Sequence, residues 1–133
     1  MGKKIFIIED NVNILAALKA KLSVLGFEVD TNLGNGNINE IKHNIIKFGP
    51  DFIILDLILP EVSGFDILKM IKHDEHIYQH LSTPVFIFAD LSDEDIKKRC
   101  DTLGADYFFV KNDFNIDEFV TKVKKIIHNN HNN

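Results

Sequence analysis

Short apolar runs and longer amphipathic stretches alternate along the whole chain. A short apolar run between turn residues predicts a strand, above all when it is rich in β-branched and aromatic residues. Five such runs are present, and the second alternates with acids, which favours a place near a sheet edge: residues 5–8, 27–31, 52–55, 85–89 and 107–110.

The stretches between these runs have the apolar spacing of helices. In the first, four leucines recur at intervals of three, four and three, and the stripe stops at Gly26, where a left-handed helix cap belongs. Ser92 and Asp95 have the spacing of a capping box ahead of a later helix. Four further stripes predict helices at residues 38–46, 64–71, 96–103 and 116–127.

Strand and helix therefore alternate five times. Strands joined by helices pair in parallel through right-handed crossovers. We expect an α/β fold, a doubly wound five-stranded parallel sheet with five helices on its two faces. Nothing in the chain is typical of a linker, so we expect a single domain over residues 1–133, with its core at 4–127 and a polar tail at 128–133.

Composition narrows the classes of function. The net charge is −5, from 15 basic and 20 acidic residues, which argues against direct nucleic-acid binding because that needs clustered positive charge. No apolar run approaches the roughly 20 residues of a membrane span, and the amino terminus lacks the apolar segment of a secretory signal. We therefore expect no membrane contact. Cys100 is the one cysteine, so we expect it to pack in the core of a protein in a reducing, cytoplasmic setting.

Charged residues directly follow three of the predicted strands. Glu9 and Asp10 end the first, Asp56 ends the third and Lys111 ends the fifth. Because function in parallel sheets concentrates at the carboxyl ends of the strands, we expect these side chains to converge. Clustered carboxylates repel one another unless a hard cation neutralises them, and oxygen-only ligation suits Mg²⁺. An Asp beside Mg²⁺ and a Lys can act as a nucleophile toward a phosphoryl group.

The segments around these residues resemble the receiver domain of two-component response regulators, over residues 4–127. The matching segments are IIEDN at 7–11, PDFIILDLILPEVSG at 50–64, PV at 84–85 and GADYFFVK at 104–111. The resemblance is to stand-alone, chemotaxis-regulator-like receivers, and it implies a flavodoxin-like sheet with strand order 2-1-3-4-5.

The resemblance also implies roles for the clustered residues. Asp56 is the expected phospho-acceptor, and Lys111 is the expected partner of the phosphoryl oxygens. The expected metal ligands are Glu9, Asp10 and Asp56, together with the backbone carbonyl of Ile58, and the expected cofactor is Mg²⁺.

The residues that would read out phosphorylation depart from the family pattern. Phe108 stands where the family has an aromatic residue that rotates inward on activation. The preceding strand ends in Ala89 and is followed by Asp90, where the family has a hydroxyl residue and then a small residue. We therefore expect activation to be weak, differently wired or absent. Lys111 is followed by Asn112 instead of proline, with one extra residue before the last helix, so we expect a trans peptide bond at this position.

Together these features predict a phosphorelay switch. Asp56 would accept a phosphoryl group from a sensor histidine kinase or a phosphotransfer protein in a Mg-dependent reaction, and the chain would then dock a downstream effector protein. The docking face would be built from the helix at 96–103, the strand at 107–110 and the last helix. A homodimer is also a possible assembly. The chain would be a regulatory domain that assists its own phosphorylation and dephosphorylation, not an enzyme.

Two alternatives remain open. Ala89 and Asp90 favour a degenerate receiver that acts as a phosphorylation-independent protein-interaction module. The intact set of Glu9, Asp10, Asp56 and Lys111 argues against it. An aspartate-nucleophile phosphatase is the other alternative, but it would carry a second acid where this chain has Ile58.

Two further patterns carry less weight. His73, His76 and His80 have spacings close to those of a metal site on a helix, but no cysteine accompanies them and a solvated loop is expected there. Gly34 and Gly36 lack the third glycine and the position of a dinucleotide-binding fingerprint.

Overall fold

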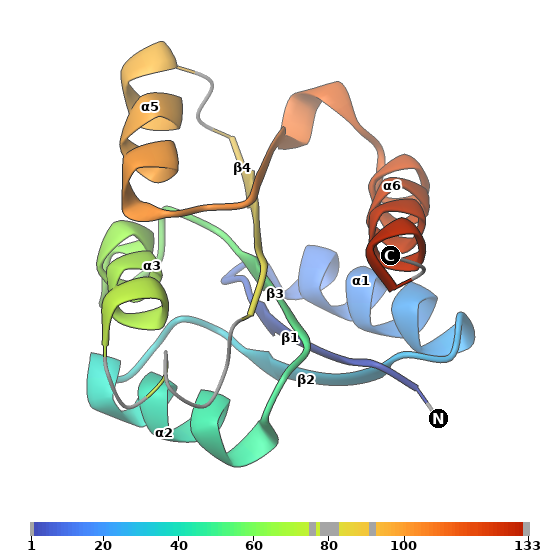
Figure 1. The fold of residues 1–133 in the computed structure, drawn as a ribbon, viewed down its shortest axis with the longest axis horizontal. Helices are drawn as coiled ribbons and strands as arrows, with labels where there is room; N and C mark the ends of the chain where they lie inside the picture. The colour runs from blue at the N-terminus through green and yellow to red at the C-terminus, as the bar shows by residue number, and fades with distance from the viewer. Residues whose placement is uncertain (1, 75–76, 78–82, 91–92, 132–133) are drawn as a thin grey trace.

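The protein is an α/β domain built on one five-stranded sheet (Figure 1). The computed structural model describes residues 2–74, 77, 83–90 and 93–131. All strands are parallel and follow the order β2-β1-β3-β4-β5, which confirms the predicted fold. The strands are β1 (Lys4–Ile8), β2 (Glu28–Asn32), β3 (Phe52–Leu55), β4 (Val85–Ala89) and β5 (Tyr107–Val110).

Helices cover both faces of the sheet. Helices α1 (Val12–Val24) and α6 (Ile116–His131) lie on one face. The other face is covered by α2 (Ile38–Phe48), α3 (Gly64–His73) and α5 (Glu94–Leu103). A short 3₁₀ turn, η1 (Lys111–Asp113), follows β5. No helix in the described part of the chain is long and apolar enough to cross a membrane.

The central strands are buried on both sides. In β1, Ile5 and Ile7 belong to the core beneath α1 and α6, whereas Phe6 and Ile8 belong to the core beneath α2, α3 and α5. Strand side chains alternate between faces, so a continuous apolar run supplies both cores, as expected for a central parallel strand. The edge strand β2, by contrast, has no fully buried residue.

Several boundaries differ from the sequence prediction, among them those of β2, α5 and α6. The edge strand runs over 28–32, one residue later than the predicted 27–31. Helix α5 is capped by Asp93, whose carboxylate accepts a hydrogen bond from the Asp95 N–H, whereas the pattern favoured Ser92, which lies outside the described residues. Helix α6 continues to His131, so residues 128–131 of the expected polar tail are helical.

An aromatic stack joins β4 to α6. The rings of Phe88 and Phe119 lie parallel with centroids 3.8 Å apart, and Phe109 meets Phe119 edge to face at 5.3 Å. Phe119 is fully buried and Phe88 almost so. Such pairs add to the free energy gained by burying their area, so this stack anchors the last helix to the sheet.

Phe119→Ala is expected to destabilise the fold by about 3–5 kcal/mol, because it leaves a cavity between Phe88 and Phe109. Equilibrium unfolding in urea measures the loss. Phe114→Ala, which removes a half-buried ring from the same cluster, should cost clearly less. Equal losses for the two variants would contradict a central role for the stack.

Candidate functional site

The sheet order brings four strand ends to one edge. Glu9 follows β1, Asp56 follows β3, Asp90 follows β4 and Lys111 follows β5. A cavity of about 320 Å³ opens at this edge, and it is lined by Asp10, Asn11, Ile14, Asp56, Ile58, Asp90 and Lys111. The structure therefore brings the predicted charged residues together.

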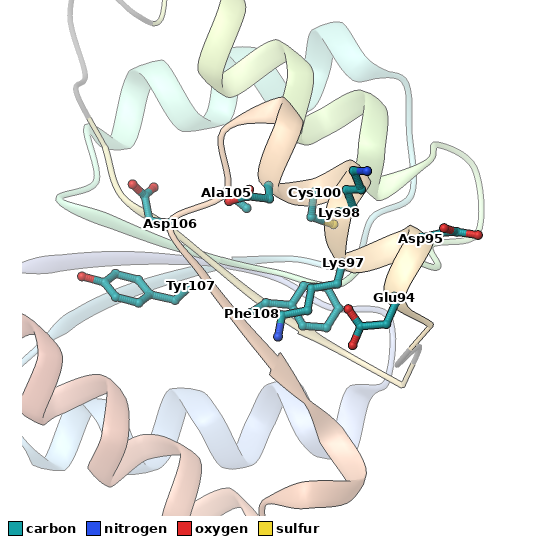
Figure 2. Close-up of a pocket in the computed structure, with 10 residues that line it drawn as sticks. Glu94, Asp95, Lys97, Lys98, Cys100, Ala105, Asp106, Tyr107 and Phe108 are labelled. Atoms are coloured by element: carbon teal, nitrogen blue, oxygen red, sulfur yellow. The ribbon is translucent and has the colours of Figure 1, made fainter.

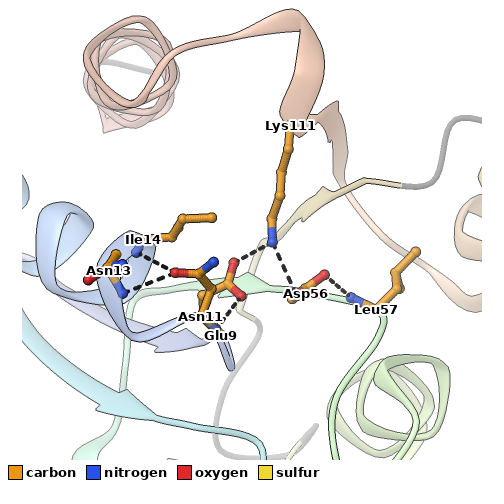
Figure 3. Close-up of polar contacts among 7 residues, drawn as sticks. All are labelled: Glu9, Asn11, Asn13, Ile14, Asp56, Leu57 and Lys111. Carbon is orange, nitrogen blue, oxygen red and sulfur yellow. Dashed lines mark hydrogen bonds and ion pairs between the residues drawn. The ribbon is translucent and has the colours of Figure 1, made fainter.

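Lys111 lies between two carboxylates (Figure 3). Its Nζ is 2.7 Å from Glu9 Oε1 and donates a hydrogen bond of 3.2 Å to Asp56 Oδ2. Both acids are nearly buried, with 2 % of Glu9 and 5 % of Asp56 exposed. The three side chains form a compact ion-paired unit drawn from β1, β3 and the turn after β5.

Backbone N–H groups orient the two buried carboxylates (Figure 3). The Leu57 N–H donates to Asp56 Oδ1 at 2.8 Å, and the Asn11 N–H donates to Glu9 Oε2 at 3.1 Å. Asn11 also caps α1, because its side-chain oxygen accepts from the N–H groups of Asn13 and Ile14. The start of α1 is thereby held beside the Glu9 carboxylate. The sequence prediction assigned Asn11 no role, although an Asn before an apolar stripe is a helix-cap signal.

Gly64 closes the loop that follows Asp56. Its N–H donates to the Leu57 carbonyl at 2.9 Å. A Cβ at this position would lie 2.4 Å from both the Asp56 carbonyl oxygen and the Leu57 Cα. Glycine is therefore required here by the close approach of α3 to the residues that follow β3.

Burial sets the electrostatics of the ion-paired unit. Burial raises the pKa of Glu9 from 4.5 to about 7, against the hydrogen bond from Lys111, and the charge of Asp56 adds to the rise. For Lys111, burial acts to lower the pKa, but the hydrogen bond to Glu9 and the charge of Asp56 outweigh it, so the pKa is raised. Lys111 therefore stays protonated, while Glu9 exchanges a proton near neutral pH.

The acids also have the arrangement of a cation site. Oxygen atoms of Glu9, Asp10 and Asp56 lie within 4.8 Å of one another. Asp10 is exposed, whereas the other two are buried. An all-oxygen donor set that is open to water on one side fits Mg²⁺. Ile58, whose carbonyl is the expected fourth ligand, lines the same cavity.

The two expected switch positions lie on β4 and β5. Ala89 is fully buried at the end of β4 and offers no hydroxyl. Phe108 is half-buried and packs against the core that contains Ala89 and Cys100. It lines a pocket of about 530 Å³ between α5 and β5 (Figure 2). Burial raises the pKa of the Cys100 thiol to about 11, so Cys100 packs as an apolar residue.

The turn after Lys111 absorbs the extra residue of this segment. Residues Lys111–Asp113 form the 3₁₀ turn, and the Phe114 N–H donates to the Lys111 carbonyl at 3.4 Å. No peptide bond in the described residues is cis, so the trans bond expected before Asn112 is confirmed.

The histidine pattern is not gathered into a site by the described residues. His73 Nε2 lies 3.0 Å from the Leu103 carbonyl oxygen, so this ring joins α3 to the end of α5. His76 and His80 lie outside the described residues.

Most of this chain matches known proteins of one family. Residues 5–124 match the family model of the response regulator receiver domain. The transcriptional regulatory protein KdpE of Mycobacterium tuberculosis is 31 % identical over 127 residues, which cover 95 % of this chain and 51 % of KdpE. This chain spans about half the length of the curated relatives it matches.

Solved structures agree with this relationship. The response regulator DrrB of Thermotoga maritima, described as an OmpR/PhoB homologue, is 28 % identical with a TM-score of 0.78, over 98 % of this chain and 54 % of that one. The chemotaxis protein CheY4 of Vibrio cholerae has a TM-score of 0.79 over 94 % of this chain and 98 % of that one. At 22 % identity, CheY4 supports the fold alone.

Mg²⁺ binding is expected to release protons and to weaken as the pH falls from 8 to 6. With a pKa of about 7, Glu9 is about half protonated at pH 7, and a cation needs the deprotonated carboxylate. Calorimetric titration in buffers of different ionisation enthalpy measures the protons released. Glu9→Gln should bind Mg²⁺ more weakly and release almost none, and proton-free binding by the wild type at pH 7 would contradict the assignment.

Proposed function

Because this chain belongs to the response regulator receiver family, we propose that Asp56 is the residue on which it accepts the family's phosphoryl group. One observation carries the proposal: the Asp56 carboxylate is held at the carboxyl edge of the sheet between the Lys111 ammonium and the Leu57 N–H. Its Oδ2 faces the cavity-lining lysine, and its Oδ1 is fixed by the backbone. A carboxylate held in this way is oriented as a nucleophile.

In the proposed reaction an Asp56 oxygen attacks phosphorus, and an acyl phosphate forms. The bond from phosphorus to the donor breaks at the same time. A phosphohistidine that is protonated on its second ring nitrogen leaves as a neutral imidazole, and a small acyl phosphate leaves as a carboxylate. Lys111 already contacts Asp56, so its ammonium is placed to pair with the oxygens of the incoming group.

We propose Mg²⁺ as the cofactor, held by Glu9, Asp10, Asp56 and the carbonyl of Ile58. The clustered carboxylate oxygens support this assignment. When bound, Mg²⁺ would neutralise charge on the transferring phosphoryl group. Lys111 now balances Glu9 and Asp56, so binding of the cation and the phosphoryl group would free it from part of that role.

The proposal extends to partners. The donor would be a phosphohistidine on a sensor histidine kinase or a phosphotransfer protein, or a small acyl phosphate, in the cytoplasm. The effector would dock on the face formed by α5, β5 and α6, where the pocket lined by Phe108 lies. Chain 1–133 would act as one receiver domain that assists its own phosphorylation and dephosphorylation, and its oligomeric state stays open.

A second function is favoured by one observation. Ala89 is buried and has no hydroxyl to bond a phosphoryl group, while Phe108 already packs against the core that contains Ala89. A receiver with this arrangement could bind its partner without phosphorylation. The ion pairs of Lys111 with Glu9 and Asp56 favour the phosphorylated switch instead.

Incubation with acetyl phosphate and Mg²⁺ is expected to add the mass of one phosphoryl group to the wild type. Asp56→Asn should add none, because an amide oxygen does not form the acyl phosphate. Asp90→Asn removes a neighbouring acid of the same cavity but keeps Asp56, and it should still add one group. Intact mass spectrometry reads all three, and an unmodified wild type would favour the phosphorylation-independent module.

Ala89→Thr is expected to enlarge the response of the effector face to phosphorylation. A hydroxyl at this position would give phosphorylated protein a charge-assisted hydrogen bond worth about 1.5–3 kcal/mol, and only such differential affinity shifts a conformational equilibrium. Amide chemical shifts over residues 96–123, with and without beryllofluoride, measure the response. Ala89→Val adds similar volume without a hydroxyl and should not enlarge it, whereas large and equal shifts in wild type and Ala89→Thr would contradict the idea.

A further inference from the structure

We propose that the turn between β2 and α2, residues 33–37, positions the cation site, and that Glu61 fastens the acceptor loop, residues 57–63, to this turn. The proposal rests on the cation site proposed above. It assigns Glu61 as a positioning residue, which acts through the backbone and not as a ligand.

The beginning of the turn is connected to the backbone of Glu9 by a hydrogen bond. The Glu9 N–H donates to the Asn32 carbonyl at 3.1 Å, which continues the pairing of β1 with β2 beyond the strands. The Asn32 side-chain oxygen accepts from the Gly34 N–H at 2.7 Å. The backbone of the turn is thus held in register with the residue that begins the acidic site.

The other end of the turn contacts the acceptor loop. The Gly36 N–H donates to a carboxylate oxygen of Glu61. Gly34 is buried against Leu59, and a Cβ on Gly34 would lie 2.6 Å from Leu59 Cδ2. Both glycines have positive φ, 74° at Gly34 and 95° at Gly36, a region that side-chain-bearing residues rarely adopt. The turn is therefore shaped to approach the loop closely.

These contacts place Ile58 between two anchors. On one side, Leu57 is fixed by its hydrogen bonds with Asp56 Oδ1 and with the Gly64 N–H. On the other side, Leu59 and Glu61 are held by the turn. Because the peptide carbonyl of Ile58 lies between these anchors, its direction depends on both of them. The contacts to the turn thus bear on a proposed metal ligand that Glu61 itself does not touch.

Substitutions of Glu61 can separate the effect of its hydrogen bond from the effect of its charge. It is exposed, so its replacement should not disturb the core. Glu61→Gln removes the negative charge but keeps an oxygen that accepts from the Gly36 N–H. Glu61→Ala removes both. A purely electrostatic effect on Mg²⁺ affinity would be the same in the two variants, whereas a positioning effect appears in Glu61→Ala alone.

The experiment is calorimetric titration of Mg²⁺ into the phosphate-free protein at constant pH and ionic strength. We expect Glu61→Ala to weaken affinity by about two- to fivefold, the range expected for loss of one exposed charge-assisted contact. Glu61→Gln should stay within about twofold of the wild type, since exposed charges are screened by salt. A second readout without Mg²⁺, the amide chemical shifts of Leu57 and Ile58, should change in Glu61→Ala and stay near wild type in Glu61→Gln.

Glu40→Ala is the matched control. Glu40 is an exposed acid beside the same turn. Its Oε1 accepts a hydrogen bond from Asn37 Nδ2 at 3.2 Å, and its N–H donates to Asn37 Oδ1 at 2.9 Å. The contacts described for Glu40 do not reach the acceptor loop. Its loss should leave Mg²⁺ affinity near that of the wild type. Equal weakening in Glu61→Ala and Glu61→Gln, or no weakening in Glu61→Ala, would overturn the positioning role while the cation site stands. A wild type that binds no Mg²⁺ would contradict both proposals.

Discussion

Two carboxylates withdrawn from water beside each other are balanced by one ammonium, and the rest of the site is arranged around this constraint. Glu9 and Asp56 are almost fully buried, and Lys111 contacts both. Burying a charge costs several kcal/mol unless it is paired and hydrogen-bonded. The backbone N–H groups of Asn11 and Leu57 supply the remaining hydrogen bonds. Burial still raises the pKa of Glu9 to about 7, and the neighbouring charge of Asp56 adds to the rise.

The sheet makes this arrangement possible. Strands β1, β3, β4 and β5 are neighbours in the sheet, so residues far apart in sequence meet at one edge. The two apolar cores hold the strands from both faces. Gly64 then allows α3 to begin directly against the residues that follow β3. The charged side chains of the site therefore lie at the ends of strands that are packed on both faces. The connecting loops set the remaining details of the site's geometry.

The parts of the structure that follow from local pattern could be predicted from the sequence. Continuous apolar runs identified the central strands, and parallel topology brought Glu9, Asp56 and Lys111 together. Contacts across long sequence separations could not be predicted in this way. The Gly36–Glu61 hydrogen bond spans 25 residues, and no local pattern around either residue indicates the other as its partner. Helix α6 reaches His131 because its apolar face is already docked, which extends a helix through residues whose own composition favours a frayed end.

Because side chains alternate between the two faces of a strand, the end of β4 presents very different groups on its two faces. Phe88 points toward α6, and its ring lies 5.8 Å from the Lys111 ammonium while stacking on Phe119. Ala89 points the other way and presents only a methyl group to the core beneath α5. The lysine thus lies beside stacked rings on one face of β4, whereas the other face of the strand ends in a single methyl group. In elastic terms, we expect a displacement of this strand end to be transmitted more directly to the last helix, through rings in contact, than to α5, through one methyl group.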